Sequence, residues 1–145
     1  MTETTSSYAV ERSVPSVRAY RYLREASGLS PKTSVAAERG LSNTLFAVQV
    51  LFHGEPVGMG RVIGDGGAFF QVVDIAVLPE HQGRGLGKKI MEEIAGYIAR
   101  EVPESGYVSL LADGQAYRLY QQFGFNFTAP ASVGMSLCKS ASSEA

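Results

Sequence analysis

The sequence of 145 residues contains one cysteine, two histidines and no tryptophan, and it has no apolar run long enough to span a membrane. A lone cysteine cannot form an intramolecular disulfide, and together with two histidines it offers too few ligands for a structural zinc site. We therefore expect no metal. The amino-terminal segment is polar and acidic, unlike a signal or transit peptide, so we expect a cytoplasmic protein without a membrane partner.

The sequence also lacks an excess of charge of either sign, because 13 Lys and Arg stand against 14 Asp and Glu. Binding nucleic acid through its phosphates needs a clear surplus of Lys and Arg, so we expect no nucleic-acid partner. With 45% hydrophobic residues, the chain is suited to a single domain. We place this domain at residues 7–138, between polar tails at 1–6 and 139–145.

The apolar periodicity predicts an α/β (α+β) fold, in which a mixed central sheet of six to seven strands is flanked by about four helices. The run 69–78 is almost continuously apolar, which favours burial on both faces and a place at the centre of the sheet. The first helix should expose Arg18, Arg21 and Arg24. We expect strands at 8–14, 44–52, 57–63, 69–78 and 107–111, and a hairpin of 125–127 with 133–137. We expect helices to start at Pro15, Pro31, Gly87 and Ala116, with Gly40 closing the second of them.

A glycine-rich loop at 82–89 separates the run 69–78 from the long helix that follows it. Its three alternating glycines allow successive N–H groups to point into one concavity at a helix N-terminus, where the helix dipole also favours an anion. Arg84, Lys88 and Lys89 lie at or near this first turn with no acidic residue among them. The loop therefore predicts a local anion site, although a flexible turn with solubilising lysines has the same composition.

The spacing of this loop excludes two common nucleotide-binding motifs. A Walker loop needs a glycine where Gln82 stands and a Ser or Thr where Lys89 stands. A dinucleotide fingerprint needs Gly-x-Gly-x-x-Gly, whereas these glycines are evenly spaced by two. Neither an ATPase nor a dehydrogenase is supported.

The segment 77–91 resembles the acyl-CoA loop of the GNAT superfamily of N-acyltransferases, whose pattern falls on Gln82, Gly85 and Gly87. The resemblance implies an N-acetyltransferase that uses acetyl-CoA as cosubstrate. In such an enzyme the loop amides would hold the CoA pyrophosphate, the strand before the loop would pair with the pantetheine arm, and the amide near Val77 would polarise the thioester carbonyl. The implied cofactor-binding residues are Ile75, Ala76, Val77, Gln82, Gly83, Arg84, Gly85, Leu86, Gly87 and Lys88.

The segment 116–125 resembles the later GNAT helix in which a tyrosine points at the CoA sulfur, and Tyr120 matches that position. As a general acid, Tyr120 would protonate the departing thiolate. Tyr120 also lies on the apolar stripe of its helix, so a purely structural tyrosine is the alternative, and Tyr117 is the second candidate for the acid.

Asp74 interrupts an apolar strand, and a buried carboxylate is costly unless it is paired or functional. This position makes Asp74 a candidate general base. The alternative is an Asp bonded to neighbouring backbone or to an arginine such as Arg61, and water could serve as the base.

The acceptor implied by the resemblance is a primary amine of a small molecule, attacked directly in a ternary complex. The loop is similar to that of glucosamine-phosphate N-acetyltransferases, so an amino sugar is one candidate. A protein or peptide amine, and a non-catalytic acyl-CoA sensor or subunit, remain alternatives. An edge strand favours a homodimer. Candidate acceptor-lining residues are Tyr20, Tyr22, Arg24, Leu29, Phe46, Arg61 and Phe70.

Overall fold

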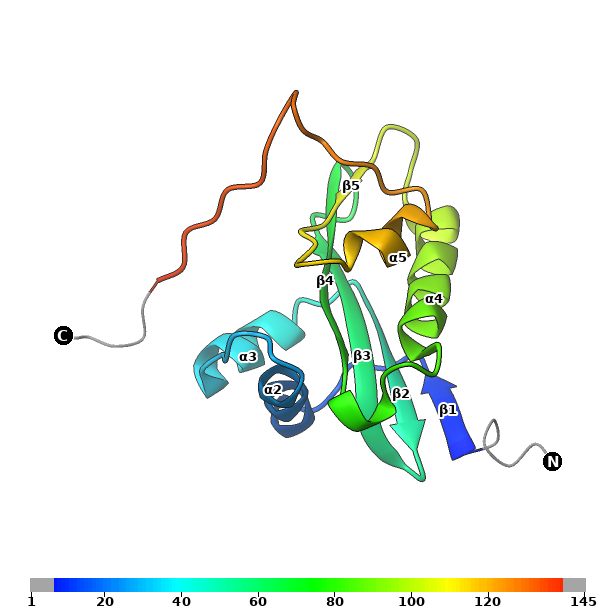
Figure 1. The fold of residues 1–145 in the computed structure, drawn as a ribbon. Coiled ribbons are helices and arrows are strands. Elements are labelled where there is room, and N and C mark those ends of the chain that lie inside the picture. The colour runs from blue at the N-terminus through cyan, green and yellow to red at the C-terminus, as the bar shows by residue number, and fades with distance from the viewer. Residues whose placement is uncertain (1–6, 140–145) are drawn as a thin grey trace. The chain divides into compact units, whose positions relative to one another are not determined.

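The computed structural model describes residues 7–139 and divides into two compact units, one ending at Leu110 and the other starting at Leu111 (Figure 1). Of the tails expected at 1–6 and 139–145, all but Lys139 lie outside the described residues. The first unit contains a sheet of order β1-β2-β3-β4-β5, antiparallel except for the parallel pair β4–β5. Its elements are β1 (Tyr8–Glu11), α2 (Val17–Ala26), α3 (Ser34–Leu41), β2 (Phe46–Phe52), β3 (Glu55–Gly64), β4 (Phe69–Val77), η1 (Pro79–His81), α4 (Leu86–Glu101) and β5 (Tyr107–Ser109).

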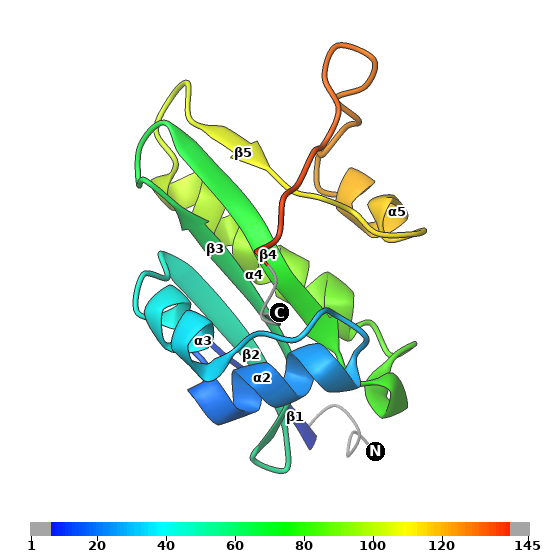
Figure 2. The ribbon, with the colours of Figure 1, turned by 90° about the vertical axis from the view of Figure 1, so that its left-hand side faces the viewer.

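Helices α2 and α3 lie on one face of the sheet and α4 lies on the other (Figures 1 and 2). Helix α2 starts after Ser16, whose hydroxyl accepts a hydrogen bond from the amide of Ala19. Thr33 caps α3 in the same way, so this helix starts three residues later than predicted. Gly40 lies inside α3 and does not end it.

The strands predicted at 44–52 and 57–63 are present as β2 and β3, and they pair as a hairpin. His53 and Gly54 form its two-residue turn with φ angles of 50° and 83°. Positive φ at both central positions is typical of a type I′ turn, whose twist matches that of the flanking strands. The hairpin therefore fixes the register of β3 against β2.

The middle strand of the sheet is β3, which corrects the prediction that the run 69–78 forms its centre. All residues from Val57 to Val62 are buried, whereas β4 alternates between buried and partly exposed positions. The difference arises because β5 pairs with β4 only from Phe69 to Gln71 and leaves the rest of that edge uncovered by a strand of the described chain.

The core of the first unit is formed where α4 packs on the sheet. Ile90, Met91 and Ile94 of α4 are fully buried, as are Val48 and Val62 of the strands beneath them. This arrangement confirms the amphipathic helix predicted after Gly87. Within residues 7–139, no helix is both long enough and apolar enough to cross a membrane.

The second unit contains one helix, α5 (Tyr117–Gln121), and no strand among its described residues. The predicted hairpin of 125–127 with 133–137 is therefore wrong, and the sheet has five strands where six or seven were expected. Both runs are short, and Pro130 between them lacks the N–H that a strand ladder needs. The predicted fold class is nevertheless correct, because helices flank one mixed sheet.

We expect Gly64→Ala to destabilise the protein, because a Cβ at this position would clash with the backbone carbonyl of Phe69 in the β3–β4 turn. The free energy of unfolding should fall by about 1–3 kcal/mol in a urea titration. Gly67→Ala is the matched control, since a Cβ there meets nothing within 4 Å. Equal stability of the two variants would contradict the prediction.

Candidate active site

The glycine loop connects the end of β4 to the start of α4. Gly83 and Gly85 adopt φ angles of 78° and 80°, which residues with a Cβ rarely adopt. A Cβ at either position would meet no atom within 4 Å, so the backbone here borders open space. The side chain of Gln82 donates a hydrogen bond of 2.9 Å to the carbonyl of Val77 and thereby ties the loop to the strand end.

The start of α4 is unusually cationic. Arg84, Lys88 and Lys89 are exposed, and the first turn contains no acidic residue. Gly85 stands at the N-cap position and provides no side chain to cap the first amides. These amides, the helix dipole and the three cations together suit a multiply charged anion such as a pyrophosphate.

The free edge of β4 leads into this loop. On the side of β5, no strand of residues 7–139 pairs with positions 72–77, which include Ile75, Ala76 and Val77. Such an edge offers backbone donors and acceptors to an extended ligand, in the manner of an added strand. The residues that the sequence assigned to the pantetheine arm therefore lie on a strand edge able to pair with it.

A β-bulge interrupts β4 next to this edge. The register places Arg61 opposite Val73 and Met59 opposite Ala76, so both Asp74 and Ile75 face Gly60. Asp74 takes up the extra residue with a φ of 62°, a conformation that Asp tolerates better than most residues. The bulge changes the direction of the backbone groups of β4 immediately before Val77.

The Asp74 carboxylate is bound by three side chains in the interior. Its Oδ1 accepts from Nη1 of Arg24 at 2.6 Å and from the hydroxyl of Tyr20 at 3.0 Å, and its Oδ2 accepts from Nε of Arg61 at 2.8 Å. The Asp74 side chain is only 5% exposed, and those of Arg24 and Arg61 are 9% and 6% exposed. The structure thus agrees with the paired-aspartate alternative that the sequence left open.

Further hydrogen bonds hold both arginines in place. Arg24 donates to the backbone carbonyl and the hydroxyl of Ser30, and Arg61 donates to the carbonyl of Gly40 and the hydroxyl of Thr44. The cluster of Tyr20, Arg24, Arg61 and Asp74 therefore joins α2, β3 and β4 to the segments before and after α3. Burial and the neighbouring Asp74 charge raise the pKa of the Tyr20 phenol, which keeps it a hydrogen-bond donor at neutral pH.

The cluster corrects one prediction, because Arg24 is buried and not part of the exposed side of its helix. Three other candidate acceptor-lining residues lie in different surroundings. Tyr22 is exposed, Phe46 stacks on Tyr97 of α4, and Phe70 belongs to the core.

Tyr120 lies in α5 of the second unit and is buried. Burial, together with the charge of Asp113, raises the pKa of its hydroxyl above the ordinary value of 10.0. The hydroxyl is therefore protonated at neutral pH, as a general acid must be. Tyr117, the second candidate, packs its ring against Phe127 at a centroid distance of 5.1 Å.

Comparison with known proteins identifies the family. Residues 42–127, more than half of the chain, match the model of the acetyltransferase (GNAT) domain. The chain belongs to this family of acetyltransferases, which confirms the prediction made from the glycine loop.

Individual relatives agree with this assignment. GCN5-related N-acetyltransferase 2, a chloroplastic protein of Arabidopsis thaliana, is 36% identical over 69 residues, which cover 48% of this chain and 26% of that protein. The match thus spans about a quarter of that curated relative. A crystal structure from meticillin-resistant Staphylococcus aureus, described as a protein of unknown function and probable acetyltransferase, is 49% identical with a TM-score of 0.87. That likeness covers 91% of this chain and 99% of the other.

The fold is also shared with a solved enzyme of known acceptor. Glucosamine-6-phosphate N-acetyltransferase from Arabidopsis thaliana has a TM-score of 0.65 and 15% identity, with 90% of this chain and 97% of that chain covered. A likeness at this level of identity shows a shared fold and does not select an acceptor.

We expect Asp74→Asn to lower the free energy of unfolding by about 3 kcal/mol, because it leaves two buried guanidinium groups without a counter-charge. Asn also tolerates positive φ, so the variant isolates the loss of charge. The control is Glu93→Gln, which removes a surface ion pair to Arg12, a residue that is 60% exposed. Urea unfolding should show a loss below about 1 kcal/mol for the control. A similarly small loss for Asp74→Asn would contradict the prediction.

Proposed function

We propose that the chain transfers an acetyl group from acetyl-CoA to a primary amine of a small molecule. The observation that carries this proposal is the free edge of β4 running into the uncapped, cationic start of α4. The strand edge supports a pantetheine arm along Ile75, Ala76 and Val77, and the amides from Gln82 to Lys88 support its pyrophosphate. Family membership implies acetyl-CoA as the acyl donor.

The proposed reaction is a direct transfer within a ternary complex. The neutral amine nitrogen attacks the thioester carbon, the new C–N bond forms, and the C–S bond breaks. The sulfur leaves with the bonding electron pair and takes a proton from the Tyr120 hydroxyl. The proton lost by the amine passes to water, and Tyr120 recovers its proton from solvent, so the products are an amide and free CoA thiol.

We infer that Asp74 acts as a positioning residue in this reaction. Both of its oxygens accept hydrogen bonds from Tyr20, Arg24 or Arg61, and these bonds hold the bulge of β4. The bulge in turn orients the amides near Val77 that would polarise the thioester carbonyl. The lone Cys138 is exposed at the end of the second unit, and direct attack requires no cysteine nucleophile.

The alternatives for the acceptor are distinguished by which amines the enzyme acetylates. A small amine, an amino sugar included, should be consumed without any polypeptide present, whereas a protein N-acetyltransferase should turn over only peptides. The homodimer and the cytoplasmic location stay predictions. A non-catalytic acyl-CoA sensor would be stabilised by CoA and release no thiol with any amine.

We expect Lys88→Gln combined with Lys89→Gln to raise the KM for acetyl-CoA about tenfold and to leave kcat nearly unchanged, because these cations face a bound anion in all states of the reaction. Thiol release measured with a chromogenic disulfide reports both constants. The matched control is Arg39→Gln, an exposed cation of α3 outside the loop. An unchanged KM in the double variant would contradict pyrophosphate binding at α4.

We expect Tyr120→Phe to lower kcat about 10²-fold, because the thiolate then leaves without an internal proton donor. Since the pKa of Tyr120 is raised, its hydroxyl stays protonated in the wild type as pH increases. We therefore expect no loss of kcat at any neutral or alkaline pH below ~10. A pH profile of thiol release tests both statements.

Tyr117→Phe is the control for this experiment, because it removes the same group from the same helix. A loss of activity in Tyr117→Phe with full activity in Tyr120→Phe would transfer the role to Tyr117. A wild-type kcat that falls with a midpoint below pH ~10 would contradict a donor with a raised pKa.

A further inference from the structure

A cluster of three rings connects β1 to the segment just before the glycine loop. Tyr8 of β1 pairs with Phe52 of β2, and the centroids of their rings lie 4.9 Å apart. The ring of His81, the last residue of η1, lies 5.7 Å from that of Tyr8 and 4.8 Å from that of Phe52. All three residues are half-buried. Residues from three distant parts of the sequence thus meet directly before the loop 82–89.

The Tyr8 hydroxyl extends this cluster into the loop itself. It lies 2.7 Å from Nδ1 of His81, and it accepts a hydrogen bond of 3.3 Å from Nη1 of Arg84. A guanidinium group has only donors, so the Tyr8 oxygen accepts from Arg84 and its own proton is available for Nδ1 of His81. In this arrangement the neutral His81 ring carries its proton on Nε2. The three side chains are therefore linked by hydrogen bonds that run in one direction.

Arg84 has few other contacts that could hold its side chain. It stands between Gly83 and Gly85, at which a Cβ would meet no atom within 4 Å. In the part of the chain that the structure describes, Arg84 forms no ion pair, and its side chain donates to the Tyr8 hydroxyl alone. An arginine side chain has many rotamers, and ordering them opposes binding. A bond that restrains Arg84 beforehand reduces this cost.

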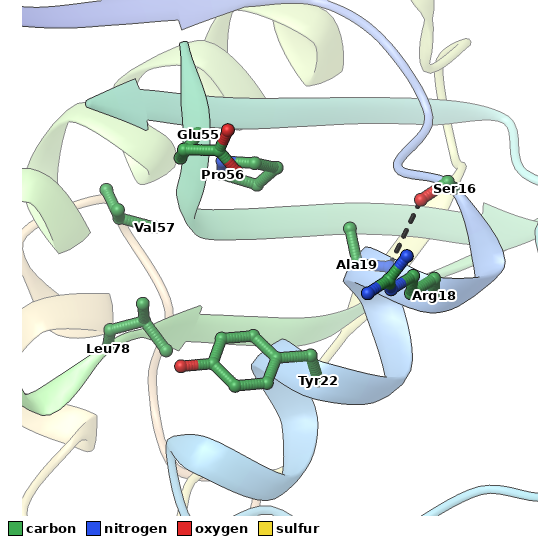
Figure 3. A pocket seen from close by; sticks show the side chains of 8 residues that line it. All are labelled: Ser16, Arg18, Ala19, Tyr22, Glu55, Pro56, Val57 and Leu78. Carbon is green, nitrogen blue, oxygen red and sulfur yellow. Dashed lines mark hydrogen bonds between the residues drawn. The ribbon is translucent and has the colours of Figure 1, made fainter. Parts of the chain in front are cut away.

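The segment that carries His81 is attached to the sheet at a second point. The amide of Leu78, just before η1, donates a hydrogen bond of 2.9 Å to the carbonyl of Val57 in β3. Leu78 and Val57 also border a pocket of about 670 Å³ (Figure 3), so side chains do not fill the space on that side. The hydroxyl of Tyr8 holds the same segment from β1. Two strands therefore determine where the glycine loop starts.

A phenol is suited to holding an arginine that must bind an anion. The guanidinium of Arg12 shows the contrast, because it lies 2.7 Å from the Glu93 carboxylate, which balances its charge. The Tyr8 hydroxyl is neutral and leaves the full charge of Arg84 available. A guanidinium has five N–H donors, so one bond to Tyr8 leaves several for phosphate oxygens. The contact can thus orient Arg84 without competing with a bound anion.

We propose that Tyr8, together with His81, is a positioning residue for the acyl donor, and that it orients the Arg84 guanidinium for the diphosphate of CoA. This role rests on the proposed binding of acetyl-CoA at the start of α4. It is measured with CoA alone, and therefore separately from acetyl transfer.

Titration calorimetry of the full chain with CoA tests the role of the hydroxyl. We expect Tyr8→Phe, which keeps the ring, to raise the Kd about fivefold. Arg84→Gln should raise it about tenfold, and the double variant should bind no more weakly than Arg84→Gln alone, because Tyr8 acts through Arg84. The control is Tyr107→Phe, because Tyr107 of β5 is 51% exposed and its hydroxyl has no hydrogen bond within residues 7–139. Its Kd should equal that of the wild type.

Two variants of His81 separate hydrogen bonding from packing. His81→Asn loses the ring and retains an acceptor close to the position of Nδ1, whereas His81→Phe retains a ring and loses the acceptor. We expect His81→Phe to raise the Kd for CoA about threefold and His81→Asn to stay near the wild type. The opposite order would show that the cluster acts by packing alone and would overturn the proposal.

Thiol release separates this proposal from the proposed function. In Tyr8→Phe the KM for acetyl-CoA should rise about fivefold with kcat nearly unchanged, and kcat/KM for S-acetylpantetheine, which lacks the diphosphate, should not change. CoA binding that depends on Tyr8, without thiol release from any amine, overturns acetyl transfer and supports the positioning role. An unchanged Kd in Tyr8→Phe, an equal loss in Tyr107→Phe or with S-acetylpantetheine, additive losses in the double variant, or no binding of CoA overturns the positioning role.

Discussion

The ion pairs between Asp74 and the guanidinium groups of Arg24 and Arg61 are the interaction on which the site depends. They are buried, and they join a helix on one face of the sheet to the two strands beneath it. Pairs of this kind gain little over an apolar core, but losing one partner is costly. Their value lies in geometry, because they fix an aspartate with positive φ at a bulge in β4. The backbone on either side of the bulge then has one defined direction.

The donor site that we propose is built mainly from backbone. Residues 75–77 provide a strand edge, and the loop from Gln82 provides amides at a helix start, so specificity for an acyl-CoA would arise from main-chain groups and a few cations. Because several cations stand together at the start of α4 with no acid in its first turn, the surface there is cationic although the chain as a whole is nearly neutral.

Local patterns predicted the parts of the structure that local forces determine. The amphipathic stripe of α4, the strands on either side of the β2–β3 turn and the glycine loop were evident in the sequence, and the motif at Gln82 identified the family. The partners of Asp74 were harder to predict, since Arg24 looks like a solvent-facing residue from helical periodicity alone. Its burial follows from a carboxylate 50 positions away. The predicted hairpin in the second unit was wrong because apolar alternation does not provide a partner strand.

The open edge of β4 also affects how the protein behaves in a crowded solution. An exposed row of strand donors and acceptors is a template onto which another chain can add, and this is a common route to aggregation. A flat template is needed for such an addition, and the bulge at Asp74 removes that flatness in the middle of the open edge. A second polypeptide strand would lose its register at this point, whereas a flexible, non-peptide chain with a few amides would follow the bend. The irregularity that we propose orients the site would thus also disfavour the addition of a second chain along this edge.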